Sequence, residues 1–273
     1  MTPVAEVNLV VDSWTTTPKA TTAGSSLGFK DNVCEDTLSS QSSYKINSGC
    51  PYYKASIAPN PKLLNDFEAI AYSIPSLGQQ DCMPIGLPQP IELGSKDFNI
   101  GIIGPGTGLG GVGLCQRDSM LFPIVGEAGH TGFAPESLVQ IKILSALHER
   151  FDRVSDERLV SGPGLENLYW ALARLHGESV APVSAAKICE LAEKNEDPRA
   201  VEAVQMFFEI LGQVAGNMAL VLGARQGMFI AGGIAQRYPS MLLSSGFRAA
   251  FEAKGRHRSL MEKIPTQLIR YPQ

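Results

Sequence analysis

The chain has 273 residues, enough for one large or two modest domains with a buried core. Charged residues make up 18% of it and the formal net charge is −4, so the composition favours neither a nucleic acid nor a membrane surface as a partner. No apolar run approaches the roughly 18 residues of a membrane span, and the N-terminus has no secretory signal pattern. We therefore expect a cytoplasmic protein.

Five cysteines are scattered along the chain without Cys-x-x-Cys spacing. This usage is typical of reduced thiols in a cytosolic protein. It predicts neither a disulfide framework nor a zinc site, and we predict no protein-held metal.

The first 62 residues differ in character from the rest. Residues 13–48 contain 14 serines or threonines, and the only strand predicted in this segment is Val7–Val11. The segment is either flexible or the remnant of a domain, and both interpretations stay open. From Leu63 onward the pattern is that of an ordinary α/β protein.

Asn65 and Asp66 form the first polar site. They follow an apolar pair and precede an amphipathic segment, Phe67–Ile74. An aspartate at such a junction is often a helix N-cap. The alternative is a carboxylate at the mouth of a cleft, where it would accept a proton from a sugar hydroxyl during phosphoryl transfer.

A glycine-rich segment follows the apolar run Phe98–Ile103. Residues 104–113 include six glycines, a density that lets backbone N–H groups converge on an anion without obstruction by side chains. Phosphate is the usual ligand of such a loop. The predicted phosphate-binding residues are Gly104, Gly106, Thr107, Gly108 and Gly110.

Two other types of phosphate loop fit this segment less well. Gly106–Gly111 satisfies G-x-G-x-x-G, but a dinucleotide fingerprint needs a helix after the loop. Here Val112–Arg117 and Leu121–Val125 are predicted strands, so we expect a hairpin. No Gly-Lys-Ser/Thr follows, which excludes a Walker loop. A structural glycine hairpin without a ligand remains as an alternative.

Two polar clusters follow the hairpin. Glu127 and His130 lie three residues apart between glycines, and this spacing can direct a carboxylate and an imidazole at the vicinal hydroxyls of one ligand. A lone histidine is more often structural, and a metal would need further ligands. Glu157 lies within Asp156–Arg158, a charge run that by itself is typical of a solvated surface.

The remainder of the chain is predicted to be mostly helical. Apolar periodicity and capping residues predict helices over Glu136–Phe151, from Leu165 to Leu175, from Ser184 to about Lys194, and from Asp197-Pro198 to about Leu222. Gly227–Ala231 is a predicted buried strand. Gly232 and Gly233 follow it and either allow close approach of a nucleotide or make a tight connection.

These motifs, in this order, resemble those of the bacterial glucokinase family of the hexokinase/actin-like ATPase superfamily. The resemblance covers roughly residues 63–270, and its segments are Leu64–Ala69, Gly104–Gly110, Gly126–His130, Glu157–Leu165, Phe229–Ile234 and Gly246–Glu252. It implies an α/β, actin-like (ribonuclease-H-like) two-domain fold whose small N-terminal domain is incomplete. The domains expected are an atypical segment at 1–62, the remainder of the small domain at 63–95 and a large domain at 96–273.

The resemblance also implies an activity. A glucokinase transfers the γ-phosphate of ATP, with Mg²⁺, to the 6-hydroxyl of D-glucose and gives glucose 6-phosphate at the entry to glycolysis. Asp66 resembles the catalytic base of the family, and the residues that resemble its glucose contacts are Asn65, Asp66, Glu127, His130 and Glu157. The loop at 104–110 resembles the second phosphate loop, and Gly232-Gly233 the loop on the adenosine side. The implied partners are D-glucose and ATP, and whether the chain forms a homodimer stays open.

The resemblance departs from the family at both ends. Relatives begin with an Asp-x-Gly-Gly-Thr phosphate loop, whereas Asp12 is followed by Ser13-Trp14-Thr15 and no Asp-x-Gly occurs in the chain. Relatives also continue into a further helix where this chain stops at Gln273. We therefore expect divergent or truncated termini, and a catalytically inactive glucokinase-like sugar-binding protein or fragment is the alternative function. Gly132 stands where many relatives carry Asp, and we expect it to remove a hydrogen bond to the turn around His130.

Overall fold

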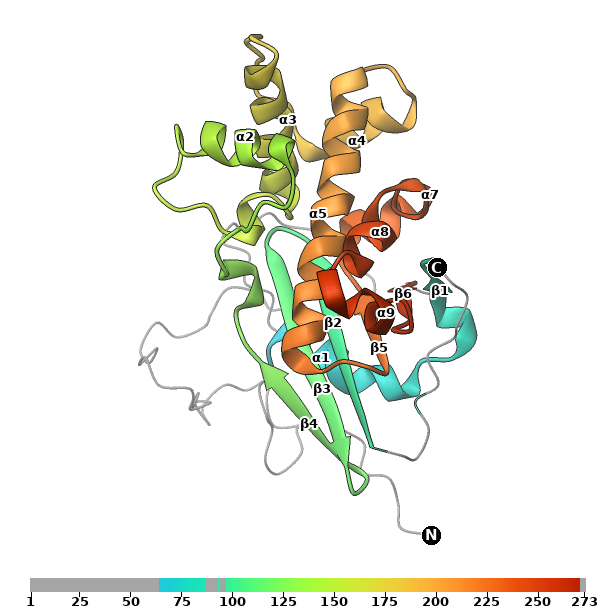
Figure 1. Ribbon diagram of the computed structural model, residues 1–273. Helices are drawn as coiled ribbons and strands as arrows, with labels where there is room; N and C mark the ends of the chain where they lie inside the picture. Colours follow the sequence, from blue (N-terminus) through green and yellow to red (C-terminus); the bar gives the residue numbers. More distant parts are fainter. Residues whose placement is uncertain (1–63, 87–92, 94–96, 271–273) are drawn as a thin grey trace, which may run out of the picture. The chain divides into compact units, whose positions relative to one another are not determined.

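The computed structural model describes residues 64–86, 93 and 97–270 (Figure 1). The chain forms two compact units, Met1–Ala69 (unit 1) and Ile70–Gln273 (unit 2). Unit 1 is described at residues 64–69, which include the start of helix α1 (Asp66–Ser73). The predicted strand Val7–Val11 lies outside the described residues, as do Cys34 and Cys50.

Unit 2 is built on a mixed sheet with strand order β1-β6-β5-β2-β3-β4. Strands β2, β5 and β6 run parallel to one another, and β1 pairs antiparallel with β6. On the other side of β2, strand β3 pairs antiparallel with β2, and β4 pairs antiparallel with β3. The strands are β1 (Cys82–Pro84), β2 (Phe98–Pro105), β3 (Leu109–Arg117), β4 (Met120–Val125), β5 (Gly227–Ile230) and β6 (Thr266–Ile269).

The predicted central strands and hairpin are confirmed. Strand β2 is almost wholly buried, as its continuous apolar run requires of a strand covered on both faces. Strand β3 begins at Leu109, three residues before the predicted start, because Leu109 pairs with Pro105 across the hairpin. The short strands β1 and β6 were not predicted, since three or four residues carry too little periodicity.

The four predicted helices of the C-terminal part are confirmed, with small shifts at their ends. Helix α3 begins at Gly162 rather than Leu165 because the Ser161 side chain caps it by accepting a hydrogen bond from Gly164 N. The helices are α2 (Leu138–Leu147), α3 (Gly162–Leu175), α4 (Ala185–Glu193), α5 (Pro198–Leu222), α6 (Gly233–Arg237), α7 (Pro239–Ser244), α8 (Phe247–Glu252) and α9 (Arg258–Met261). Short 3₁₀ turns are η2 (Ile74–Ser76), η3 (Gln79–Asp81), η4 (Ala128–His130), η5 (Asp156–Arg158) and η6 (Gly255–His257).

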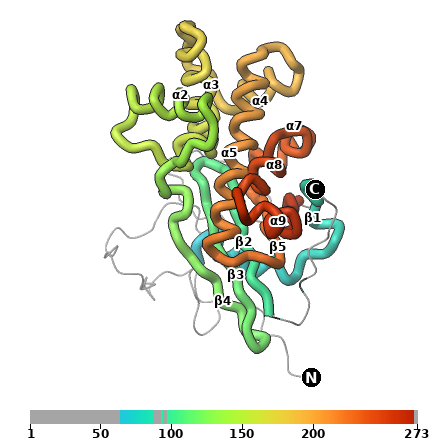
Figure 2. The backbone as a smooth tube through the Cα atoms, viewed as in Figure 1, coloured from blue at the N-terminus to red at the C-terminus, as the bar shows by residue number. Residues whose placement is uncertain are grey.

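Helix α5 is the centre of the core of unit 2 and packs against β2, α3, α4 and α8 (Figures 1 and 2). It approaches the sheet closely where Leu222 lies over Gly113, since a Cβ at Gly113 would come within 2.9 Å of the Leu222 side chain. Among the described helices, α5 is the one whose length and apolar composition would suffice for a membrane span. Core helices pass the same test, and most of its apolar residues are buried inside unit 2.

Candidate functional site

The glycine-rich segment forms the tight end of the β2–β3 hairpin. The last pair of the ladder is Pro105 with Leu109, and Gly106 N donates a hydrogen bond to Gly108 O at 2.8 Å across the loop. Gly106 O accepts a hydrogen bond from Gly162 N at 2.8 Å, which ties the loop to the first turn of α3. An antiparallel hairpin at this place is incompatible with a dinucleotide βαβ unit, as expected.

Glu157 lies against this hairpin and not on a solvated surface. Its Oε2 accepts a hydrogen bond from Leu109 N at 2.9 Å. A Cβ at Gly108 would lie 2.5 Å from the same oxygen, so the glycine makes room for the carboxylate. The side chain is half-buried and joins η5 to the predicted phosphate loop. The interpretation of this charge run as a solvated surface is therefore wrong for Asp156 and Glu157, while Arg158 is exposed.

The turn that carries Glu127 and His130 packs on the same strand. Gly129 between them is buried, and a Cβ there would lie 2.2 Å from Leu109 O. The buried glycine is the residue of the turn that packs against the strand, and the side chains of Glu127 and His130 on either side of it are exposed to solvent. Exposed carboxylate and imidazole groups there can accept and donate hydrogen bonds to hydroxyls of a ligand.

Thr131, Arg153 and Asp156 connect η4 to η5, and sequence reasoning missed all three. Thr131 Oγ1 lies 2.8 Å from Ala128 O and 2.5 Å from Asp156 Oδ2, and Arg153 Nη2 donates to His130 O at 2.8 Å. Asp156 is buried, which raises the pKa of its carboxyl from 3.8 to about 6, while the Thr131 hydrogen bond and the Arg153 charge oppose the rise.

Gly132 lies beside this connection and forms a β-bridge with Ser155. We expected it to leave the turn around His130 short of a hydrogen bond. In the structure that turn is held by Thr131 and Arg153 instead. The only sequence signal for Asp156 is its place in the charge run Asp156–Arg158, which does not indicate that one of these residues is buried.

The second glycine pair lies directly on the hairpin. Gly232 has φ +89°, and a Cβ there would lie 2.3 Å from Pro105 O. Gly104 meets the same connection from the other side, since its Cβ would lie 2.8 Å from the carbonyl carbon of Ala231. These two glycines are required for close packing of β2 against the β5–α6 connection. Gly106 and Gly233 face open space, so their backbone can be approached by a ligand.

Asn65 and Asp66 belong to unit 1 and are described by themselves. Helix α1 begins at Asp66, and the residue in the N-cap position is Asn65, whose Oδ1 accepts from Phe67 N at 2.9 Å and whose carbonyl accepts from Ala69 N at 2.9 Å. The hypothesis that Asp66 is the N-cap is therefore wrong. Its side chain is exposed and accepts from Phe67 N at 2.8 Å.

The predicted site residues thus fall into two groups. The structure brings together the hairpin loop, the Gly232–Gly233 connection, Glu157 and the turn η4, which carries Glu127 and His130. Asn65 and Asp66 belong to unit 1 and form the second group. Within the described ranges, no cluster of three or more His, Cys, Asp or Glu residues could hold a metal ion.

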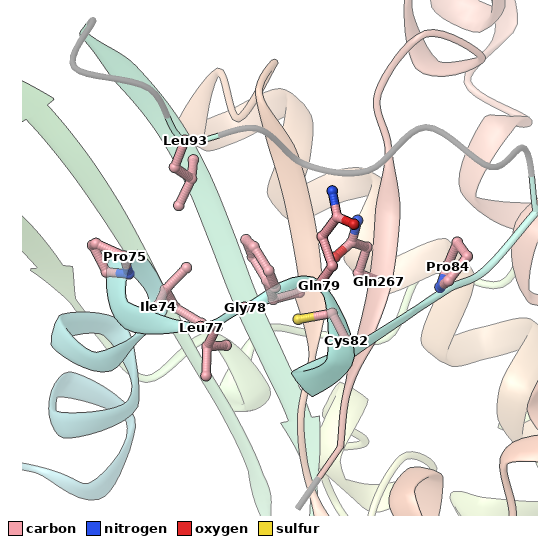
Figure 3. A pocket seen from close by; sticks show the side chains of 10 residues that line it. Ile74, Pro75, Leu77, Gly78, Gln79, Cys82, Pro84, Leu93 and Gln267 are labelled. Carbon is pink, nitrogen blue, oxygen red and sulfur yellow. The ribbon is translucent and has the colours of Figure 1, made fainter.

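A separate cavity of about 300 Å³ lies between residues 74–84 and the strands β5 and β6 (Figure 3). Gln79 and Gln267 present neighbouring amides to it, and Phe229 contributes an apolar wall. Burial, and secondarily the charge of Asp81, raises the pKa of the Cys82 thiol in its wall, which disfavours the reactive thiolate. The residues that line this cavity do not include the predicted site residues.

Comparison with known proteins identifies relatives for most of the chain. The family model for glucokinase matches residues 54–273. A curated glucokinase from Xanthomonas campestris pv. campestris (strain 8004) is 41% identical over 214 residues, and one from Nitrobacter hamburgensis is 42% identical over 207 residues. The matches cover 77% and 76% of this chain. The chain spans less than two thirds of the length of these relatives, 63% in both cases.

Solved structures agree with the sequence relatives. The crystal structure of a glucokinase from an Antarctic psychrotroph has a TM-score of 0.72 and 33% identity, and the match covers 77% of this chain and 64% of that one. A glucokinase from Balamuthia mandrillaris, solved in complex with glucose, has a TM-score of 0.67 at 22% identity, over 78% of this chain and 62% of that one, and so supports the fold. The predicted α/β fold class of the actin-like sugar kinases is confirmed.

Proposed function

Because the chain belongs to the glucokinase family, we propose that it transfers the γ-phosphate of ATP to the 6-hydroxyl of D-glucose and forms glucose 6-phosphate. The observation that carries the proposal is the contact between Glu157 and the hairpin loop. One carboxylate joins the loop expected to bind phosphate to the surface expected to bind the sugar. A phosphoryl-transfer enzyme needs these two surfaces side by side, since catalysis depends on positioning the donor and acceptor.

In this proposal Glu127, His130 and Glu157 bind the hydroxyls of glucose. Hydroxyls both donate and accept hydrogen bonds, and two carboxylates with an imidazole offer matching partners. The buried Gly129 supports this role because it fixes the turn on Leu109 while leaving Glu127 and His130 exposed. Asn65 would add a sugar-binding amide from unit 1.

Asp66 would accept the proton of the attacking 6-hydroxyl. An aspartate is suited to this role in phosphoryl transfer because it needs only to orient the hydroxyl and take its proton as the bond to phosphorus forms. Asp66 is exposed at the first turn of α1, where a ligand can reach it.

The hairpin loop would bind the phosphates of ATP, and Gly232-Gly233 the adenosine side. Backbone N–H groups of the loop around the open Gly106 would stabilise charge on the transferring phosphoryl group, although the Gly106 N–H itself is bonded to Gly108 O. Mg²⁺ would enter bound to the phosphates of ATP, as part of the substrate. We place this reaction in the cytoplasm, in a fold with a small domain ending near residue 95 and a large domain from 96.

The test is an assay of glucose 6-phosphate formation by the whole chain with ATP and Mg²⁺. Asp66→Asn should lower the rate by about 10²- to 10⁴-fold, the usual contribution of a general base, while glucose still binds. Asp118→Asn is the matched control, because Asp118 is an exposed aspartate at φ +48°, a conformation that Asn also adopts. If the wild type binds glucose but transfers no phosphate, the alternative of a sugar-binding protein is favoured. If it binds neither glucose nor ATP, the proposed kinase and the sugar-binding alternative are both overturned.

A further inference from the structure

Asp156 is a buried carboxylate whose position is fixed from both sides. Its residue is 7% exposed, its backbone N donates to Thr131 O at 3.0 Å, and its carbonyl accepts from Leu159 N and Val160 N. These backbone bonds hold Asp156 within η5, next to Glu157. Its side chain can therefore reach only a small set of partners, and Oδ2 lies 2.5 Å from Thr131 Oγ1.

Thr131 passes this contact on to the turn η4. Its hydroxyl lies 2.8 Å from Ala128 O and can donate its one proton to that carbonyl or to Asp156, while its backbone N donates to the Ala128 carbonyl at 3.2 Å. Ala128 stands between Glu127 and His130 in the turn, so a fixed Ala128 carbonyl fixes the backbone that carries both side chains. Arg153 supports the same turn through its hydrogen bond to His130 O.

We propose that Asp156 is a positioning residue that acts through Thr131 to hold Glu127 and His130 in the geometry that binds sugar hydroxyls. The inference rests on the proposed function for its ligand, but the link between η5 and η4 is independent of that function. Asp156 itself faces Thr131 rather than the ligand.

The cost of burying a carboxyl supports a role beyond packing. A buried ionised carboxyl is disfavoured unless it is well paired, and an apolar residue would fill the same space more stably. The raised pKa of Asp156 reflects this cost, which the Thr131 hydrogen bond and the nearby Arg153 guanidinium only partly offset. What the carboxyl adds is a directional contact to the turn, which an apolar side chain cannot make.

The contact can be removed from either end. Asp156→Ala deletes the carboxyl, and Asp156→Asn keeps a polar group of the same shape that can still pair with the hydroxyl. Thr131→Val removes the hydroxyl and leaves the buried Asp156 carboxyl without this partner, and Thr131→Ser restores it. The matched control is Tyr169→Phe, which removes a hydroxyl that donates to Asp197 Oδ2 at 2.7 Å, in the contact between α3 and the start of α5.

Two measurements on the full chain decide the matter: amide hydrogen exchange of residues 128–131 without ligand, and the Kd of D-glucose by calorimetry. Asp156→Ala and Thr131→Val should each speed exchange of the Thr131 amide and weaken glucose binding about tenfold. Asp156→Asn and Thr131→Ser should keep the exchange rate and the Kd of glucose close to their wild-type values, and Tyr169→Phe should change neither quantity. In the double variant the effect should stay near that of one replacement, because both remove the same contact.

Unchanged exchange and unchanged Kd in both variants would overturn the inference, as would equal effects from Tyr169→Phe. If exchange at the turn responds but the wild type binds no glucose, the proposed function fails while the link from Asp156 to the turn stands. If glucose binds and the variants leave its Kd unchanged, the proposed function survives and the positioning role is refuted.

Discussion

A methyl group added at Gly108 would lie 2.5 Å from Glu157 Oε2, closer than a carbon and an oxygen can approach. The carboxylate must then swing away and release Leu109 N, to which it is bonded at 2.9 Å. A hydrogen bond to a charged group contributes about 1.5–3 kcal/mol. Alanine restricts the unfolded chain and offsets about 0.4–1 kcal/mol of this loss. Gly108→Ala should therefore lower the free energy of unfolding by about 1–2 kcal/mol.

Gly106→Ala is the matched control in the same loop. A Cβ there meets nothing within 4 Å, so the replacement should leave the unfolding free energy unchanged or raise it by up to about 1 kcal/mol. Urea unfolding followed by circular dichroism measures both variants. If Gly106 approaches the phosphates of ATP, its variant should weaken ATP binding without loss of stability.

Removal of the Glu157 carboxylate should abolish the cost of the Gly108 replacement. In a Glu157→Ala background the carboxylate is already absent, so Gly108→Ala should no longer be destabilising. Equal unfolding free energies for Gly108→Ala and Gly106→Ala in the wild-type background would refute the account. So would a cost at Gly108 that persists without Glu157, since it would then arise elsewhere in the loop.

Two further predictions concern the surroundings of the site. Burial raises the pKa of Asp156 to about 6, so between pH 4 and pH 6 the folded state keeps a proton that the unfolded chain releases. The stability that this proton contributes is therefore present below pH 4 and is lost as the pH rises through 6. The unfolding free energy of the wild type relative to Asp156→Asn should fall by about 2 kcal/mol between pH 4 and pH 7 in urea titrations, and a constant difference would contradict this. Gly232 has a positive φ, and a Cβ there would lie 2.3 Å from Pro105 O, so Gly232→Ala should lower the free energy of unfolding by about 3 kcal/mol or more. Gly233→Ala places its methyl group in open space and should leave the melting temperature nearly unchanged.

The long elements of unit 2 were predictable because each carries a local signal. The β2–β3 hairpin followed from an apolar run, a glycine cluster and a second strand, and the N-terminus of α5 from Asp197 before Pro198. The positions of β1 and β6 in the sheet could not be predicted from the sequence. Their pairing joins segments separated by more than 180 residues, and a three-residue strand has almost no pattern of its own.

The candidate site was only partly predictable for a similar reason. Glu127, His130 and Glu157 are polar residues in short turns, and a resemblance to known motifs identified them. Asp156 belongs to the same charge run as Glu157, yet it is buried and bonded to a threonine 25 residues away. The sequence contains no local signal for such a contact, because it arises only when the two turns η4 and η5 meet.

The bond between Glu157 and Leu109 has a thermodynamic consequence in the proposed kinase. A carboxylate has acceptor positions for both a backbone N–H and a sugar hydroxyl, so one side chain can serve the loop and the acceptor together. If glucose steadies Glu157 and so raises the affinity of the loop for ATP, ATP must raise the affinity for glucose by the same factor. The loop would then be best ordered when both substrates are present, which would disfavour the transfer of phosphate to water.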